Sequence, residues 1–600
     1  MRMLKYGFAS MLAVGITMLS PVEGQGPAIQ LQLKAEQSMW RLAGTDALNR
    51  SFGPSAGKLA AEKTVGVFYS LWLGQHKSGQ KAVYDIQKLS ETNPEALNDV
   101  KGRPESPLNE FHFWGEPLYG YYSMSDPWVV TRHIELLTNA GVDYLCIDAT
   151  NRVLYAEPVK NLLRVLTMFV EQGFKAPKVV FYTNSFSGTT VDDLYNQFYK
   201  SGIYNHLWFS PLGKPMIIGI TEKNGKASDM TRHNEFTDFI KPEMQQYFDV
   251  RESQWPNGDY NRVSIPWMSW QYPQWNHNGT VAVPVAQHSH SVIVASAMHP
   301  ESSRGYNNVT KQVEKDWTAG ANFQTMWDAV FQSKANIDHV LITSFNEWMA
   351  IKYANAHGHD KVFFVDVYNH EFSRDIEMMR GGYQDNFYLQ LARNIRRFKL
   401  KEVPPAGYKE KTIDIIKGLD SQWKDVESVY TDVAGDAISR NFLNATGTHT
   451  YTDNSNRNDI TEVKVAHDKK MLYFRITTAS PVTVYNNNDV NWMNILIKTK
   501  KPGSNFAGYQ YIINRKPATR KKTSVEQSSG GYNWKASGNA QYVVKNNVMQ
   551  VAVPLHAVGL TANKVSFEFK VSDNVTRYND IMDYYVTGDS APIGRMNYAY

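Results

Sequence analysis

The sequence has little cysteine and no long apolar run. Cys146 is the single cysteine among 600 residues, so an intramolecular disulfide is impossible. It lies in the apolar run Tyr144–Ile147, which favours a buried, unreactive thiol. After the first 24 residues, no segment reaches the ~18 uninterrupted apolar residues that suggest a membrane span. We therefore expect a chain without disulfides and without a transmembrane helix.

Charge of one sign is also scarce. Lysine and arginine total 63 and aspartate and glutamate 58, giving a net charge of +5. No dense basic block stands out beyond Arg520–Lys522, so nucleic acid is not an expected partner. The glycine-rich phosphate-binding motifs and the Gly-x-Ser-x-Gly motif of α/β-hydrolases are missing too. These absences argue against nucleotide-dependent chemistry and against an α/β-hydrolase.

Two histidine pairs could place imidazoles close together, His288 with His290 and His357 with His359. A transition-metal site needs three or four ligands, and neither pair has further ligands at a supporting spacing. We therefore expect no metal centre and no cofactor.

The first 24 residues have the pattern of a secretory signal peptide. Arg2 and Lys5 precede an apolar run, Phe8–Leu19, and Val22 and Gly24 supply the small residues before a cleavage site. Export without disulfides suits the periplasm or outer surface of a bacterium better than an animal secretory route. We expect a secreted bacterial protein that acts as a monomer.

Aromatic residues are abundant, with 15 Trp and 34 Tyr. Such rings stack on carbohydrate, although large cores also use them. After an N-terminal segment at 25–60, residues 61–400 alternate strand-like and helix-like runs, which is typical of a parallel α/β architecture with eight units, a (β/α)8 barrel. The predicted strands are 65–73, 144–148, 178–183, 215–220, 248–254, 264–270, 291–297 and 340–345.

The composition changes after a proline-containing linker at 401–411. Residues 412–600 contain short alternating strands separated by turn residues, with no helical pattern between them. Regularly spaced strands of this kind predict a β-sandwich domain.

The most informative motif is His339–Trp348. A short buried strand, Val340–Ser344, is followed at once by Asn346, Glu347 and Trp348. Active-site residues of (β/α)8 barrels lie at the carboxyl ends of the strands. Glu347 is therefore a candidate catalytic acid or base; the alternative is a glutamate that forms an ion pair with a neighbouring arginine or lysine.

Glycoside hydrolysis typically needs two carboxyl groups, a proton donor and a nucleophile or base. Asp148 and Glu301, which follow predicted strands, are the candidate partners of Glu347. The alternatives are that Asp148 caps a helix or pairs with Arg152, and that Glu301 pairs with Arg304. Further polar and aromatic residues at the predicted strand ends or in the segment after the first strand are candidate substrate contacts, each with a core role as its alternative: Trp72, His112, Trp114, Glu116, Tyr122, Asp126, Asn184, Trp255, Trp270, His299, Asn346 and Trp348.

The segment Ser344–Trp348 resembles the strand-eight motif of the family 99 and family 71 glycoside hydrolases. Gly66–Trp72 is similar to their first strand, and Tyr121–Pro127 to the segment before their second, so the resemblance covers residues 60–400. It implies a (β/α)8 enzyme for α-linked glycans with Glu347 as a catalytic carboxylate. Family 99 has a second glutamate three residues later, where this chain has Ala350, so the resemblance supplies no second carboxylate.

The C-terminal region resembles a family 9 carbohydrate-binding module in Ile416–Trp423, Val463–Ile476 and Phe567–Asp573. Trp492, Tyr509 and Trp534 are candidates for stacking on sugar rings; the equal alternative is that they are core residues of a domain that only braces the barrel. The whole sequence predicts a secreted glycoside hydrolase for a complex polysaccharide or glycan. The alternatives are a non-catalytic glycan-binding protein, which Ala350 favours, and a metal-assisted enzyme using His357 and His359. Sugar, linkage, endo or exo action and stereochemical outcome stay open.

Overall fold

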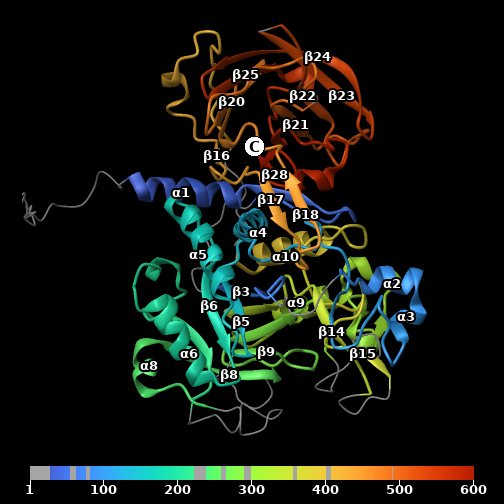
Figure 1. The fold of residues 1–600 in the computed structure, drawn as a ribbon. Coiled ribbons are helices and arrows are strands. Elements are labelled where there is room, and N and C mark those ends of the chain that lie inside the picture. The colour runs from blue at the N-terminus through green and yellow to red at the C-terminus, as the bar shows by residue number, and fades with distance from the viewer. Residues whose placement is uncertain are drawn as a thin grey trace, which may run out of the picture.

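The computed structural model describes residues 27–54, 63–75, 82–221, 238–257, 265–288, 299–355, 361–399, 407–489, 491–519 and 521–600. The predicted signal peptide, the predicted strand at 291–297, most of the linker and the residues His290, His357 and His359 lie outside these ranges. An α/β body and an antiparallel β body lie on either side of helix α1 (Pro27–Trp40) (Figure 1). None of the helices in the described ranges has both the length and the apolar character that a membrane crossing requires.

The α/β body contains an eight-stranded sheet in the order β10-β13-β3-β5-β6-β7-β8-β9, with parallel ladders throughout. This order follows the chain around the sheet, as in a (β/α)8 barrel. No ladder joins β9 to β10 in the described chain, although the two strands are in contact. The strands are β3 (Thr64–Tyr69), β5 (Tyr144–Ala149), β6 (Lys178–Thr183), β7 (Met216–Gly219), β8 (Asp249–Asn257), β9 (Ile265–Met268), β10 (Thr280–Pro284) and β13 (His339–Thr343).

Seven of these strands overlap predicted ones, and the exception is β10, which occupies the seventh place instead of residues 291–297. Most of the strands are nearly continuous buried runs, as expected when both faces of a parallel sheet are covered. The helices of this body are α4 (Pro127–Ala140), α5 (Ala156–Glu171), α6 (Ser187–Leu194), α8 (Pro242–Tyr247), α9 (Ala321–Gln332) and α10 (Asn386–Lys399).

Helix α4 shows how the sequence sets such an element. Asp126 accepts a hydrogen bond from the Trp128 backbone N–H (3.0 Å), and Pro127 occupies the first helical position. Gly141 ends the helix at φ 87°, a left-handed conformation that glycine adopts without strain. The carboxylate of Asp126 therefore has a structural use before any ligand is considered.

A small lobe follows the segment that contains Glu347, between β13 and β14. It contains α2 (Ile86–Thr92), α3 (Pro94–Asn98) and the antiparallel sheet of β15 (Val362–Phe364), β14 (Met349–Ala354) and β4 (Phe111–Phe113) (Figure 1). In this sheet Ala350 pairs with His112. A two-stranded ladder of β11 (Tyr306–Asn307) and β12 (Gln312–Val313) precedes α9.

The β body is built around one 13-stranded antiparallel sheet rather than two separate sheets. Tyr598 OH donates to the Thr431 carbonyl (3.0 Å) and Tyr430 OH to the Ala599 carbonyl (2.7 Å), so the sheet curls until its first strand meets its later ones. Its members are β16 (Val429–Thr431), β19 (Ile460–His467), β20 (Met471–Thr478), β21 (Asn494–Lys498), β22 (Tyr511–Thr519), β23 (Lys522–Gly530), β24 (Asn533–Lys545), β25 (Val548–Pro554), β26 (Glu568–Asp573), β27 (Asp589–Ala591), β28 (Met596–Ala599), β1 (Leu42–Thr45) and β2 (Ser51–Phe52).

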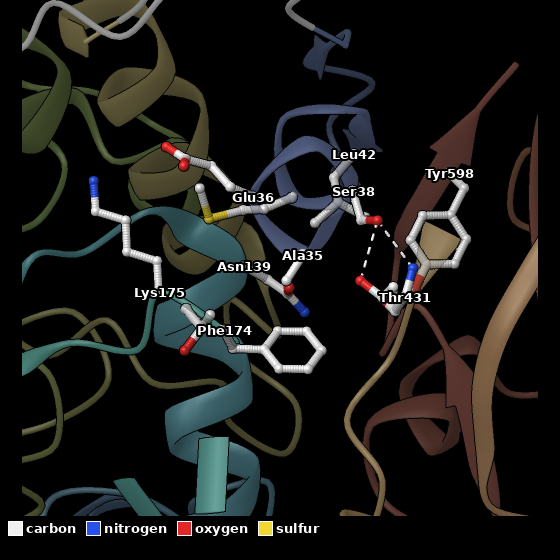
Figure 2. Close-up of a pocket in the computed structure, with 11 residues that line it drawn as sticks. Ala35, Glu36, Ser38, Leu42, Asn139, Phe174, Lys175, Thr431 and Tyr598 are labelled. Carbon is white, nitrogen blue, oxygen red and sulfur yellow. Dashed lines mark hydrogen bonds between the residues drawn. The ribbon is translucent and has the colours of Figure 1, made fainter. Parts of the chain in front are cut away.

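The two bodies are joined by both ends of the chain. Strand β1 pairs with β28, which places the N-terminal segment in the β body. Helix α1 fills the junction, where Ser38 Oγ accepts from the Thr431 backbone N–H (2.9 Å). Residues of α1 line a small pocket there, together with Asn139 and Phe174 of the α/β body (Figure 2). A hairpin of β17 (Arg440–Leu443) and β18 (Thr450–Asp453) extends from the β body to the α/β body (Figure 1).

Of the three aromatics considered for glycan binding in the β body, two are core residues. Trp492 is 2% exposed and Tyr509 1% exposed. Trp534 is half-buried against Phe506 and Tyr532.

Candidate active site

Glu347 follows β13 directly, and its backbone is held from two sides. Its N–H donates to Asp375 Oδ1 (2.5 Å), and its carbonyl accepts from Trp114 Nε1 (2.9 Å). The next residue, Trp348, stacks on Trp114 with ring centroids 4.0 Å apart. The peptide segment is therefore fixed, while the Glu347 side chain keeps part of its surface accessible.

The environment of Glu347 favours its protonated form. Burial among protein atoms raises the pKa of this carboxyl well above its usual value. The nearby negative charge of Asp366 raises it further, and the guanidinium of Arg374 opposes the shift only in part. A protonated carboxyl just beyond the carboxyl end of a strand of the parallel sheet can act as a general acid.

Asp366 lies in the loop after β15 and has the opposite character. Burial alone would raise its pKa, but the hydrogen bond from His288 Nε2 (2.7 Å) and the positive charges of Arg374 and His288 outweigh burial and lower it. Arg374 Nη2 lies 3.8 Å from Asp366 Oδ1, and Arg374 Nη1 donates to the Asp366 carbonyl (2.5 Å). These contacts favour the ionised form of Asp366, whereas the surroundings of Glu347 favour its protonated form.

Asp375 orients Glu347 through the backbone. Burial raises the pKa of Asp375 to about 6, and the charge of Arg304 acts against this rise. Arg304 Nη1 donates to the Asp375 carbonyl (2.6 Å), so the guanidinium supports the loop as well as the charge. Within the described residues, Asp375 Oδ2 is buried and has no hydrogen-bond partner.

Aromatic rings lie beside the Asp366 carboxylate, after β9 and β10. Trp270 stacks on His288 with ring centroids 5.1 Å apart and an interplanar angle of 14°. Trp267 meets the same imidazole edge-on at 5.8 Å, and the Arg374 guanidinium lies 5.3 Å from the Trp267 ring. Trp270 is half-buried, so it offers an apolar surface of the kind on which a sugar ring stacks.

Two other predicted residues lie at the same ends of the strands. The charge of Asp148 raises the pKa of Glu347, and its Oδ1 accepts from Thr150 N–H (2.9 Å) and Oγ1 (2.8 Å). Asn184 follows β6; Ser253 Oγ donates to its Oδ1 (3.3 Å), while its buried Nδ2 has no partner among the residues described.

Several predicted contact residues hold the framework behind the site. Asn346 clamps Ser70, accepting from its N–H (2.9 Å) and donating to its carbonyl (3.0 Å). Trp72 packs on Phe111, with ring centroids 5.2 Å apart. Trp114 and Trp348 are fully buried.

His112 and Tyr122 also belong to buried polar networks. His112 bonds to Ser106 Oγ and to the Glu110 carbonyl, both at 2.9 Å, and burial lowers its pKa to about 3. Tyr122 OH donates to Glu377 Oε2 (2.6 Å). Glu377 also accepts from Trp348 Nε1 (2.5 Å), which fixes the indole behind Glu347.

Four predicted residues lie apart from the pair of Glu347 and Asp366. Asp126 pairs with Arg440 of the β body (2.7 Å), and Glu116 pairs with Lys88 (2.6 Å). His299 Nδ1 lies 3.5 Å from Glu301 Oε1, and both side chains are partly exposed. The side chain of Trp255 is not among those that the structure describes.

Two arginines were the alternative partners of Glu301 and Asp148. Arg304 donates to Ser373 and Asp375 in the interior, and Arg152 lies over the Phe186 ring (5.2 Å). Three residues of the site, Asp366, Arg374 and Asp375, were missed. The one signal for Asp366 was its position directly after the short apolar run Val362–Val365.

No protein-family model matches the sequence, and no curated protein matches it either. Among solved structures, the chain is similar to the GH99 endo-α-mannosidase of Bacteroides thetaiotaomicron in complex with bis-tris propane, at 18% identity and a TM-score of 0.30 over 56% of this chain and 96% of that one. A second structure of an enzyme of that description gives 16% identity and a TM-score of 0.29 over 56% and 97% of the two chains. A glycoside hydrolase-like protein gives 13% and 0.30 over 56% and 94%. Similarity at this level establishes neither a shared fold nor a shared chemistry.

Proposed function

We propose that this protein is a glycoside hydrolase that cleaves bonds in a complex polysaccharide or glycan, with Glu347 as proton donor and Asp366 as the second carboxylate. One observation carries the proposal: two neighbouring carboxyl groups beyond the strand ends have their pKa values shifted in opposite directions. At a single pH, such a pair supplies a protonated carboxyl that can act as an acid and an ionised carboxylate that can act as a base or nucleophile.

The chemistry follows from these two states. Protonated Glu347 gives its proton to the glycosidic oxygen as the bond to the anomeric carbon breaks. Ionised Asp366, held by His288 and Arg374, stabilises the positive charge that develops on the sugar and attacks the anomeric carbon or activates water. Trp270 offers a stacking face next to this carboxylate.

Asp148 stays a candidate for the second carboxylate because its charge also acts on Glu347. Glu301 has weaker support, since it pairs with His299 at a partly exposed position. Export to the bacterial periplasm or cell surface, action as a monomer and a supporting or glycan-binding role of the β body complete the proposal; the signal-peptide pattern supports the first of these.

The test compares hydrolysis of a broad polysaccharide and oligosaccharide panel by the wild type, Glu347→Gln and Asp366→Asn. We expect each substitution to lower the rate by about 10²–10⁴-fold, because each keeps the shape and removes an ionisable group. Asp328→Asn is the matched control, because Asp328 on α9 pairs with Arg397 on α10 at a partly exposed position. An Asp366→Asn enzyme with wild-type rate, together with an inactive Asp148→Asn enzyme, would assign the second role to Asp148.

A second candidate is a non-catalytic glycan-binding protein. It is favoured by Ala350, which is buried in β14 opposite His112 and leaves no acid at that position. If this candidate is right, the wild type binds glycans from the panel but releases no sugar above background, and Glu347→Gln behaves in the same way.

A further inference from the structure

Five carboxyl groups that the proposed active site does not use meet at the junction of the two bodies. Glu135 lies on α4, and Asp432, Asp436, Asp459 and Asp589 belong to the β body. Ligand oxygens of Glu135, Asp432 and Asp436 lie within 4.8 Å of one another, and so do those of Asp436, Asp459 and Asp589. Asp436 is common to both groups, so the five acids form one continuous cluster.

Oxygens of this cluster are buried without a protein partner. Glu135 Oε1, Asp432 Oδ2, Asp436 Oδ1 and Asp459 Oδ1 have no hydrogen-bond partner within the described chain. The residues Glu135, Asp432 and Asp436 are only 4%, 7% and 5% exposed. A buried acceptor without a donor costs roughly 1–3 kcal/mol, and more when it is charged. Several such oxygens aimed at one another indicate a missing ligand.

The two neighbouring cations do not satisfy these oxygens by hydrogen bonds. Arg132 donates to the carbonyls of Asp436 (3.3 Å) and Val586 (3.1 Å). The ammonium group of Lys570 donates to the Pro592 carbonyl. Both cations therefore lower the negative charge of the region while leaving the carboxylate oxygens free to bind another group.

A small cavity lies beside the cluster. It has a volume of about 20 Å³, and its walls include Glu135, Asp436 and Asp589. A space of this size holds one water-sized particle. Three of the five acids therefore line a space that fits a monatomic ion, and the side chain of Arg132 lines it as well.

We propose that this cluster binds a divalent cation of the calcium type, clamped between helix α4 and the β body. Ca²⁺ takes oxygen ligands at about 2.3–2.6 Å, so two oxygens on opposite sides of one ion lie roughly 5 Å apart. The mutual limit of 4.8 Å in each group fits this span. Carboxylates, carbonyls and water are the ligands that this hard ion prefers, and no soft ligand is present in either group.

The experiment uses the full chain after removal of metals with a chelator. Ca²⁺ is added in steps, and binding is followed by calorimetry and by the unfolding temperature, with Mg²⁺ in a parallel series. We expect Ca²⁺ to bind and to raise the unfolding temperature progressively with concentration, because a ligand that binds only the folded state stabilises it. Failure of the wild type to bind Ca²⁺ at millimolar concentration would overturn the proposal.

Two variants test whether the ion binds at this cluster. Asp436→Asn changes the residue shared by both groups, and Glu135→Gln changes the ligand from the α/β body; each is expected to abolish or strongly weaken Ca²⁺ binding. Asp126→Asn is the control, since it disturbs another contact between the bodies and should keep the Ca²⁺-dependent rise. Unchanged binding in both cluster variants refutes the site. If these variants do not fold, the wild type decides: a rise in unfolding temperature with Ca²⁺ that exceeds the rise with Mg²⁺ supports the site, and the lack of any such rise overturns it.

Discussion

The ion pair of Arg440 and Asp126 joins the two bodies, and its removal should destabilise the whole chain. Arg440 Nε donates to Asp126 Oδ2 (2.7 Å) and Nη1 to the Tyr119 carbonyl (2.9 Å), with side chains 6% and 2% exposed. Arg440→Met keeps the packing over the Trp128 ring but leaves the Asp126 carboxylate buried without its cation. Breaking one partner of a buried pair costs about 3–5 kcal/mol, so we expect the free energy of unfolding to fall by that amount.

The assay is a double-mutant cycle by urea unfolding. Asp126→Asn keeps a side-chain oxygen for the cap of α4, because asparagine and aspartate cap helices equally well. It should nonetheless destabilise, since Arg440 then lacks its charge partner. In the double variant no unpaired charge remains, so its loss should be smaller than the sum of the single losses by about 0.5–3 kcal/mol. Additive losses would refute the coupling and return Asp126 to the candidates for substrate contact.

Three further predictions concern buried titratable groups. Asp375→Asn should move the basic limb of the pH profile of kcat/KM to lower pH, because removing a negative charge beside Glu347 lowers the pKa of the proposed acid; an unmoved limb would contradict the assignment of that limb to Glu347. Between about pH 3 and 6.5 the unfolded chain protonates His112 while the folded chain does not, so unfolding free energy should fall with decreasing pH by up to ~1.4 kcal/mol per unit from this group, and His112→Gln should remove that slope in urea titrations. Glu377→Gln should cost about 1–3 kcal/mol in the same assay, because its oxygen can still accept from Tyr122 OH but its N–H₂ would replace the oxygen that faces His133 Nε2; a variant as stable as the wild type would contradict this bonding.

Local sequence patterns were sufficient for most of the parallel sheet. Apolar runs such as Lys178–Thr183 coincide with an observed strand because a buried parallel strand is apolar on both faces. The exception, Thr280–Pro284, is short and ends in proline, a residue that normally argues against an interior strand. Residues 291–297 form a longer β-branched run and were predicted in its place. Which run pairs with β13 is decided by tertiary contacts that a local pattern does not contain.

The candidate site was accessible from sequence only in part. Glu347 follows its strand directly, so a local pattern identifies it. Asp366 is placed by Arg374, which lies eight residues later in the same connection between β15 and α10, and by His288, which follows β10; its backbone has a φ of 66°. No spacing rule links two loops that meet only after folding. The opposed pKa shifts that distinguish the two carboxyls are likewise consequences of burial and of charges distant in sequence.

The β body depends on both ends of the chain, so the predicted linker does not separate two independent units. Leu42 to Gly44 pair with Tyr598 to Met596, and the Ala599 N–H donates to the Arg41 carbonyl (3.0 Å). Without the N-terminal segment, β28 would be left with an exposed edge on that side, and exposed edges invite association with other chains. The sequence of the N-terminal segment at 25–60 gives no sign of this pairing, since the partner strand lies at the opposite end of the chain.

The β body also contributes to the order of the proposed active site. Tyr451 of the β17–β18 hairpin accepts from the Tyr121 backbone N–H (2.9 Å). The adjacent Tyr122 donates to Glu377, and Glu377 accepts from Trp348, the residue directly after the proposed proton donor. Hydrogen bonds therefore connect the hairpin to the indole behind the site through one backbone step and one buried carboxylate. Because such a chain fixes each group only while every member is satisfied, the β body supports the framework of the proposed active site, whether or not it also binds glycan.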